Sequence, residues 1–344
     1  MNRNIFIYGL GSIGQRYARL LRAMYGGEVN LFTKRRRNRN EIIDPSLQSS
    51  RHFDPTNFFN IQKVDRFSEL PDSLDLSIIA SPIHLHISDL IDICEQTNSY
   101  LVLLEKPLAG MGSKNYSITN DSNLNKIKSK EIFMSFQSRY SKLYEKLNQE
   151  VDALDPKQIY TYRSWFSENL ETMHPYEDYR TSHMGNSEQQ GDPLSCFSHD
   201  IDILVSLMGE AKIINYQEYN CTSLQISTPD YQRITAKIVK DPRIIAQIEM
   251  DFIGWPPRRG GELMFKDGRI EWNWLKQELF VTTKSRGIES FNFSDISRDE
   301  ILIEMLSDIL ENRDRDSVKA ANLEDAMLVN SFIQLAEQER SRYE

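Results

Sequence analysis

The chain has 344 residues, 40% of them hydrophobic and 26% charged, which is typical neither of disordered chains nor of membrane proteins and is enough for two domains. There are 41 Lys and Arg residues against 50 Asp and Glu, and the net charge of −9 disfavours nucleic acid as a partner. The three cysteines, Cys94, Cys196 and Cys221, are too widely spaced for a disulfide framework or a Cys-x-x-Cys zinc site, so we expect no bound metal.

The sequence contains no obvious segment for membrane insertion or export. No apolar run approaches the roughly 18 residues that a spanning helix requires. The first residues, MNRNIFIYGLG, lead directly into a strand-like run without the charged, apolar and cleavage regions of a secretory signal. We therefore expect a cytoplasmic protein that does not bind membranes.

The first hundred residues alternate short apolar runs with helical patterns. Apolar side chains recur at helical spacing in residues 13–24 and 87–94, and Gly26-Gly27 ends the first helix. Strands are predicted at residues 4–8, 29–32, 74–79 and 100–104. This alternation is typical of a parallel sheet whose strands are connected by helices.

Beyond about residue 150 the pattern becomes that of antiparallel strands. In residues 244–252 apolar and polar side chains alternate strictly, so that one face is buried and the other is wet. Turns at 240–242 and 267–268 predict tight connections between neighbouring strands. Two helical stretches close the chain, residues 301–310 and 323–336. The change of pattern predicts two domains, residues 1–135 and residues 136–344.

A glycine-rich turn, Gly9-Leu10-Gly11-Ser12-Ile13-Gly14, lies between the first strand and the first helix. The first glycine permits the turn, the second lets backbone approach a pyrophosphate, and the third lets helix and strand pack closely. Backbone N–H groups at the helix start, including those of Ser12 and Ile13, then form an anion site. The context on both sides favours a dinucleotide site over a simple βα turn.

The end of the second strand indicates which dinucleotide binds. An NAD site usually has an acid there, about 20 residues beyond the glycines, to hold the ribose 2′-hydroxyl. This sequence has Thr33, Lys34 and Arg35 instead. A hydroxyl followed by cations suits a 2′-phosphate, so we predict NADP(H) as the preferred cofactor, with NAD(H) as the alternative. A solvated surface loop is the other interpretation of this basic run.

Several motifs together resemble one family. After two of the predicted strands come Ala80-Ser81-Pro82-Ile83-His84-Leu85-His86 and Glu105-Lys106-Pro107-Leu108-Ala109, and a later helix begins with Ser198-His199-Asp200-Ile201-Asp202. In this order they resemble the glucose-fructose oxidoreductase / inositol dehydrogenase / MocA family. The segments Asp178-Tyr179-Arg180 and Leu323-Glu324-Asp325-Ala326 are also similar to that family, so the resemblance covers nearly the whole chain.

The resemblance implies an α/β protein. Its N-terminal Rossmann domain would have a doubly wound parallel sheet, and its C-terminal α+β domain an open, mostly antiparallel sheet for substrate binding and oligomerisation. The implied activity is that of an NAD(P)-dependent oxidoreductase acting on CH–OH groups of a sugar, sugar acid or nucleotide-linked sugar, in surface-glycan biosynthesis. The implied partners are a small sugar-like substrate and a second copy of the chain in a homo-oligomer.

The resemblance also implies roles for individual residues. Lys106 would contact the reacting oxygen beside the nicotinamide, and His199 would exchange the proton. The chemistry agrees, because histidine exchanges protons near neutral pH and a lysine at the carboxyl end of a strand can stabilise an oxyanion. Tyr179 and Arg180 are expected at the substrate, although a structural salt bridge would explain Arg180 equally well. The remaining cofactor contacts are expected from Ser81, Pro82, His86, Glu105 and Lys106.

The sequence departs from the family pattern just before His199. Family members usually carry an aspartate three or four residues earlier, where this chain has Ser195 and Cys196. Asp192 is a candidate substitute, and a Cys196–His199 nucleophilic pair is a weaker alternative to a buried structural cysteine. The missing acid also supports a different class of function, a catalytically weak NADP-binding sensor or scaffold of the same fold.

Overall fold

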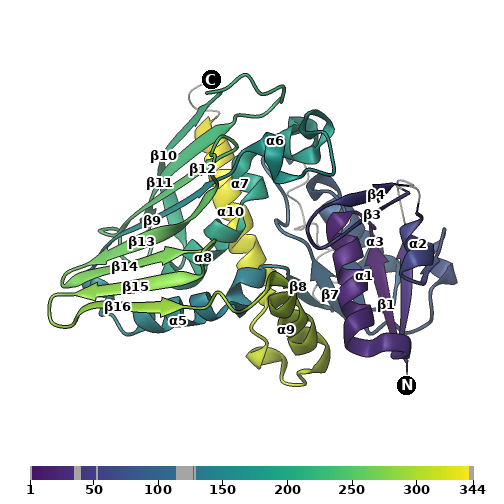
Figure 1. The fold of residues 1–344 in the computed structure, drawn as a ribbon. Helices are drawn as coiled ribbons and strands as arrows, with labels where there is room; N and C mark the ends of the chain where they lie inside the picture. Colours follow the sequence, from purple (N-terminus) through teal and green to yellow (C-terminus); the bar gives the residue numbers. More distant parts are fainter. Residues whose placement is uncertain (1, 35–39, 52, 114–126, 128, 341–344) are drawn as a thin grey trace.

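The computed structural model describes residues 2–34, 40–51, 53–113, 127 and 129–340. The described chain is built on two large sheets with helices packed against them (Figure 1). A short ribbon of β3 (Glu41–Ile43) and β4 (Ser49–Arg51) lies beside the first sheet. This architecture confirms the predicted fold class, a Rossmann-like parallel sheet followed by a mostly antiparallel one.

The first sheet has the strand order β17-β8-β7-β6-β1-β2-β5. Its strands are β1 (Arg3–Tyr8), β2 (Val29–Lys34), β5 (Ile61–Lys63), β6 (Leu76–Ile79), β7 (Leu101–Leu104), β8 (Glu131–Met134) and β17 (Ala321–Asn322). All pairings are parallel except that of β17 with β8. The strand order reverses between β1 and β6, and a doubly wound sheet binds its ligand at the carboxyl ends of the strands at this point.

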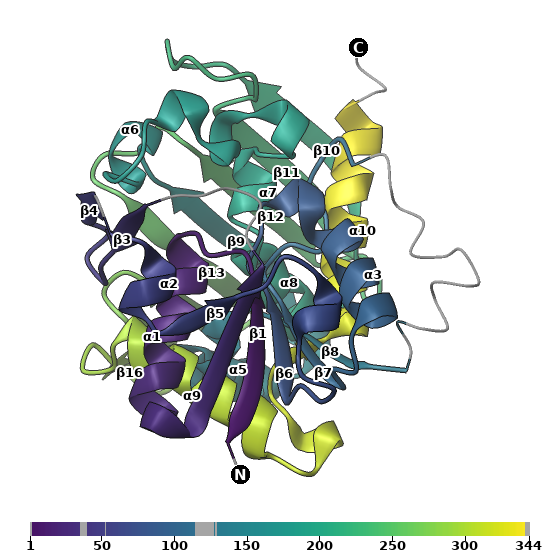
Figure 2. The ribbon, with the colours of Figure 1, turned by 90° about the vertical axis from the view of Figure 1, so that its right-hand side faces the viewer.

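The buried side chains of β1 point alternately into two cores. Ile5 and Ile7 pack with helix α1 (Ser12–Tyr25) and with α9 (Arg298–Glu311), whereas Phe6 and Tyr8 pack with α3 (His86–Gln96) on the other face. Figure 2 shows α1 beside α9 at one side of this sheet. The sheet is therefore covered on both faces, as its apolar strands require.

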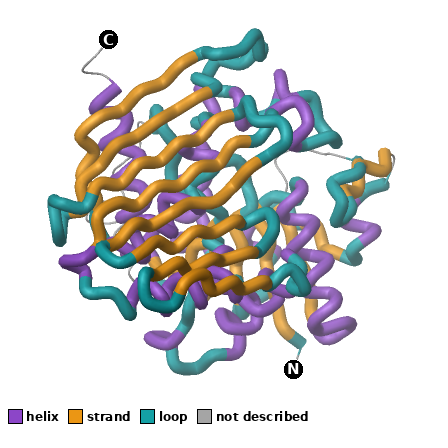
Figure 3. Tube along the Cα trace, turned by 60° about the vertical axis from the view of Figure 1, so that its left-hand side comes forward, coloured by secondary structure: helices purple, strands orange, loops and turns teal. Residues whose placement is uncertain are grey.

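The second sheet has the strand order β10-β11-β12-β9-β13-β14-β15-β16, and only the β12–β9 pair is parallel. Its strands are β9 (Ile159–Ser167), β10 (Ala211–Tyr219), β11 (Tyr231–Ile238), β12 (Ile245–Asp251), β13 (Arg258–Phe265), β14 (Gly268–Asn273), β15 (Glu278–Thr283) and β16 (Gly287–Asn292). Helices α5 (Lys142–Asp152), α8 (His199–Met208) and α10 (Leu323–Arg340) lie on its inner side (Figure 1). Figure 3 shows the outer face, which none of the described helices covers.

Among the described residues, short α-helices also connect these elements, namely α2 (Pro55–Phe58), α6 (Leu170–Met173) and α7 (Pro193–Cys196). The alternation predicted in residues 244–252 is present, with Ile244, Ala246 and Ile248 buried. The predicted hairpin at 267–268 is also present, since Phe265 of β13 pairs with Gly268 of β14. Both predicted C-terminal helices form, each a few residues longer than the pattern indicated.

The C-terminal part of the chain returns to the first sheet. After β16 the chain forms α9, which packs on α1, and then β17, which adds an antiparallel edge strand next to β8. Only then does α10 run back beside β10 (Figure 1). Residues from both halves of the sequence thus build the covering of the first sheet.

Candidate active site

The loop between β1 and α1 has the glycine geometry of a phosphate loop. Gly9 has a φ of +100°, and a Cβ there would lie 2.9 Å from the carbonyl oxygen of Ala80. A Cβ on Gly14 would lie 2.2 Å from the carbonyl oxygen of Gly9, so only glycine lets the helix approach the strand this closely. A Cβ on Gly11 would have no neighbouring atom within 4 Å.

These residues fit a dinucleotide. Gly11 is the N-cap of α1 and no side chain caps the helix, which leaves backbone N–H groups for an anion. The open space at Gly11 is where a pyrophosphate approaches backbone in this type of fold. In such a site Gly9, Gly11, Ser12 and Ile13 would hold the phosphates, while Gly14 acts by packing.

A cavity of about 1050 Å³ extends from this loop into the space between the two sheets, and we call it the cleft. Residues from both halves of the sequence line it. Among them are the predicted Gly9, Gly11, Ser12, Ile13, Lys34, Ser81, Pro82, His86, Glu105, Lys106 and His199. The structure thus brings both expected catalytic side chains to the cavity that contains the phosphate loop.

Lys106 follows β7, at the carboxyl end of the parallel strands. Its Nζ donates a hydrogen bond to the backbone carbonyl of Cys196, 2.5 Å away. Desolvation by the surrounding protein lowers the pKa of Lys106. Lys106 therefore contacts the segment that leads into α8, and among the described residues its Nζ has a neutral acceptor and no carboxylate partner.

Glu105 is fixed by a hydrogen-bonded chain beneath the cleft. The buried Tyr17 hydroxyl of α1 lies 2.6 Å from Glu105 Oε1 and 2.7 Å from Ser135 Oγ. Tyr17 can donate to the carboxylate and accept from the serine. This contact joins the helix that follows the phosphate loop to the residue before Lys106.

His199 is the first residue of α8 and is almost completely buried. Its Nδ1 has no hydrogen-bond partner in the described part of the chain. Burial, together with the charges of Lys106, Arg259 and Arg298, holds the pKa of this imidazole well below its usual value. His199 is therefore neutral at physiological pH, the form that accepts a proton.

The segment before His199 does not supply the missing acid. Asp192 caps α7 and accepts hydrogen bonds from the backbone N–H and the hydroxyl of Ser195. Burial raises the pKa of Asp192 to about 6, and its partners are those of the cap, not His199. Burial also raises the pKa of the Cys196 thiol to about 12, which argues against a thiolate nucleophile.

His86 holds two loops of the cleft together. It is buried, with Nδ1 2.6 Å from the carbonyl oxygen of Pro107 and Nε2 2.9 Å from that of Ser81. Burial lowers the pKa of His86. Its position fits a residue that packs behind the loops that would contact the cofactor and so keeps them in place.

At the end of β2, the residues expected to bind a 2′-phosphate differ in their surroundings. Thr33 is fully buried and its hydroxyl donates to the carbonyl of Ile7, 2.8 Å away, so we remove it from the expected cofactor contacts. Lys34 lines the cleft, with Nζ 4.2 Å from the centre of the Phe67 ring. Arg35 lies outside the described residues.

Tyr179 and Arg180 do not line the cleft. Arg180 is exposed and forms a bidentate ion pair with Asp178, whose carboxylate also caps the turn by accepting from the Arg180 N–H. This local pairing accounts for Arg180, the structural alternative considered from the sequence. Asp200 and Asp202 likewise form buried ion pairs, with Arg259 and Arg139.

The sequence analysis missed several residues of the cleft, above all Arg259 and Arg298. Arg259 lies on the inward face of β13, and extending the alternation back from Leu263 would have indicated this. Nothing local distinguishes Arg298, the first residue of α9. Other missed residues line the cleft between and after these elements: Phe166, Glu168, His174, Glu177, His183, Phe197 and Trp274.

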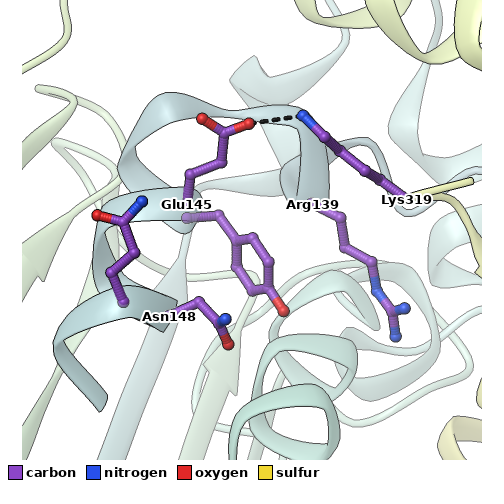
Figure 4. A pocket seen from close by; sticks show the side chains of 6 residues that line it. Arg139, Glu145, Asn148 and Lys319 are labelled. Atoms are coloured by element: carbon purple, nitrogen blue, oxygen red, sulfur yellow. Dashed lines mark hydrogen bonds and ion pairs between the residues drawn. The ribbon is translucent and has the colours of Figure 1, made fainter. Parts of the chain in front are cut away.

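A second, smaller pocket of about 470 Å³ lies between α5 and Lys319 (Figure 4). Its cations are already paired: Lys319 with Glu145 at 2.7 Å, and Arg139 with Asp202 at 2.7 Å and Asp325 at 2.8 Å. Arg139, just before α5, thus joins α8 to α10, and Lys319 joins α5 to the segment between α9 and β17. We therefore assign this pocket a structural role.

Within the described ranges, no group of three or more His, Cys, Asp or Glu side chains is arranged to hold a metal ion. Nor does any described helix combine the length and the apolar character needed to cross a bilayer.

Comparison with solved structures shows the same fold along nearly the entire chain. An NAD-binding oxidoreductase from Klebsiella pneumoniae has 15% identity and a TM-score of 0.75, over 100% of this chain and 98% of that one. A UDP-N-acetylglucosamine 3-dehydrogenase from Acidithiobacillus ferrooxidans has 12% identity and a TM-score of 0.72, over 98% of both chains. A biliverdin reductase from Synechocystis, solved with biliverdin and NADP+, has 13% identity and a TM-score of 0.70, over 98% of both chains.

No curated protein matches the chain. Residues 3–115 match the family described as an oxidoreductase family with an NAD-binding Rossmann fold. This segment contains the phosphate loop, the Ala80–His86 motif and the Glu105–Ala109 motif. The glycine loop and the position of Lys106 agree with this match, which shows that the N-terminal third of the chain is the NAD-binding Rossmann part of an oxidoreductase of the glucose-fructose oxidoreductase / inositol dehydrogenase / MocA type.

Proposed function

We propose that the protein transfers hydride between NADP(H) and a carbon carrying a hydroxyl or keto group in a sugar, sugar acid or nucleotide-linked sugar. The observation that carries this proposal is that Lys106 and His199, from opposite halves of the sequence, line the same cavity as the phosphate loop. The sugar class is supported by the similarity to a UDP-N-acetylglucosamine 3-dehydrogenase.

The nicotinamide would accept or supply the hydride. In the oxidative direction, Lys106 Nζ donates a hydrogen bond to the substrate hydroxyl oxygen and stabilises the negative charge that develops there. His199, held neutral by burial and by neighbouring cations, takes the hydroxyl proton. Phe166 and Phe197, which stack at 3.8 Å and line the cleft, exclude water from this space.

The preference for NADP(H) rests on Lys34, which lines the cleft at the end of β2, and on the neighbouring Arg35. No acid occupies the usual position of an NAD-selective carboxylate. NAD(H) is the alternative cofactor, since the similar structures include an NAD-binding protein as well as an NADP+ complex.

A homo-oligomer formed through the outer face of the eight-stranded sheet is also proposed, because none of the described helices covers that face (Figure 3). The cytoplasmic location and the role in surface-glycan biosynthesis stay predictions.

The proposed function is tested with Lys106→Ala and His199→Ala against a panel of sugars, sugar acids and nucleotide-linked sugars. Each change should lower kcat/KM by about 10²- to 10⁴-fold, because each removes a group that acts on the reacting hydroxyl. The dissociation constant of NADPH should change little in His199→Ala. Lys284→Ala, on a surface turn where Lys284 pairs with Asp267, is the control and should keep wild-type rates.

The second candidate is a catalytically weak NADP-binding sensor or scaffold. It is favoured by one observation, the absence of a partner on His199 Nδ1 among the described residues. Tight NADPH binding with no turnover that depends on Lys106 or His199 would support this candidate and contradict the enzyme.

A further inference from the structure

Arg298 stands out among the charged side chains of the cleft. It is the first residue of α9 and lines the same cavity as Lys106 and His199. The residue as a whole is exposed, but the protein around the guanidinium desolvates it and lowers its pKa. The guanidinium thus lies in the same cleft as the reacting groups without belonging to the phosphate loop.

Arg298 has no ion-pair partner in the described part of the chain. Within the described ranges its polar partner is the side-chain amide of Gln137, whose oxygen lies 3.0 Å from Nη2 and 3.2 Å from Nε once the amide is turned so that this oxygen faces the guanidinium. A guanidinium has five N–H donors, so roughly three are left without a protein acceptor. The neighbouring arginines differ, since Arg259 pairs with Asp200 at 2.8 Å and Arg16 with Asp299 at 2.7 Å.

No described carboxylate that lines the cleft forms an ion pair with Arg298. Glu105 is held by the Tyr17 hydroxyl at 2.6 Å. Glu168 feels Arg259 and Arg298 at a distance, but burial dominates and raises its pKa. Lys106 donates to a neutral carbonyl. Within the described ranges, Lys34, Lys106 and Arg298 thus line the cleft without an ion pair, and a cation that has lost part of its hydration is stabilised when an anion binds.

We propose that Arg298 binds a carboxylate of the substrate, so that the site takes a sugar acid in preference to the neutral sugar. This inference rests on the proposed function, because it places the carboxylate beside the hydroxyl that Lys106 and His199 act on. A guanidinium matches a carboxylate in two parallel hydrogen bonds, and the free donors of Arg298 supply both. The carboxylate end would then fix which hydroxyl faces Lys106.

The test measures binding, so it does not depend on turnover. The protein is saturated with NADPH, and the affinities of two matched pairs are measured by calorimetry: D-glucuronate against D-glucose, and D-galacturonate against D-galactose. The wild type should bind at least one acid about tenfold or more tightly than its neutral partner, the range expected for a charge-assisted pair. Arg298→Ala should abolish this preference, and Arg298→Lys should retain part of it. Arg286→Ala, a surface arginine that pairs with Glu289, is the control and should keep the preference.

Three results would overturn the inference. They are a wild type that binds neither acid, a wild type that prefers the neutral sugars, and an Arg298→Ala variant that loses both classes equally. A loss of NADPH affinity in Arg298→Ala with the acid preference intact would show that the guanidinium serves the cofactor pyrophosphate instead. Failure of the proposed function would give a result different from these. Acids would bind through Arg298, but no substrate would be turned over in a reaction that depends on Lys106.

Discussion

Lys34 is the described residue on which the proposed preference for NADP(H) depends most. It follows the buried Thr33 at the end of β2, and its ammonium lies over the Phe67 ring, 4.2 Å from the ring centre. An ammonium over an aromatic face is held in place while its remaining N–H groups stay free for an acceptor. In the cleft, the acceptor that distinguishes the two dinucleotides is the 2′-phosphate.

Replacing Lys34 with alanine should weaken NADPH binding by about tenfold, because one charge-assisted contact to phosphate is lost, and should change NADH binding less than twofold. Both affinities can be measured by fluorescence titration of the reduced cofactors. Lys63→Ala, on the exposed strand β5 where Lys63 pairs with Asp65, is the matched control. Equal losses for the two cofactors would contradict the 2′-phosphate role.

At the scale of elements, the start of α1 shows how two glycines of one motif act differently. Gly14 is needed for packing, because the Cβ position meets the backbone oxygen of Gly9. Gly11 instead leaves space open at the helix start, because a Cβ added to it would have no neighbour within 4 Å. Its φ of −75° is one that alanine adopts without strain.

Gly14→Ala and Gly11→Ala should therefore separate stability from binding. Gly14→Ala should lower the free energy of unfolding by about 1–3 kcal/mol, since backbone must move to admit the methyl group. Gly11→Ala should leave stability within about 0.5 kcal/mol but weaken dinucleotide binding, because its methyl group enters the pyrophosphate space. Denaturant unfolding and NADPH titration measure the two effects. A Gly11→Ala protein with wild-type affinity would argue against a phosphate at that place.

At the scale of the whole molecule, the two halves of the sequence share a hydrophobic core and a sheet. Tyr17 and Leu21 of α1 share a core with Leu302 and Leu306 of α9, and β17 closes one edge of the first sheet. The first sheet is thus completed by the last fifty residues of the chain.

A fragment of residues 1–135 should consequently fail to fold cooperatively, although it contains the entire glycine motif. It would expose the apolar surface of α1 that α9 covers, and exposed surface of this kind favours aggregation or a loosely packed state. Near-UV circular dichroism and dye binding, compared with the full chain, would report this. A monomeric fragment with a sharp unfolding transition and NADPH affinity would contradict the expectation.

Much of this architecture could be predicted because its signals are local. The strands of both sheets follow from apolar runs and alternation, and the phosphate loop from the spacing of three glycines. Lys106 and His199 could be predicted because each adjoins the end of an element within a recognisable motif. Their meeting in one cleft came from the resemblance, not from any local pattern.

The errors have physical causes. Thr33 was expected to face the cofactor, but β2 continues to Lys34 and so keeps the threonine inside the sheet. Arg180 was expected at the substrate, but the neighbouring Asp178 pairs with it. Arg298 was not found, because its entry into the cleft depends on how α9 packs against α1, and such a tertiary contact leaves no trace in local sequence.

The continuity of the cleft from Gly11 to His199 has a consequence for the order of addition. A dinucleotide extending from the phosphate loop would fill the inner part of this single cavity, and its nicotinamide would become a wall for the second ligand. A sugar that arrived before the nucleotide would lack the part of its binding surface that the nicotinamide supplies. We therefore expect compulsory-order kinetics, in which the nucleotide enters before the sugar and leaves after the product.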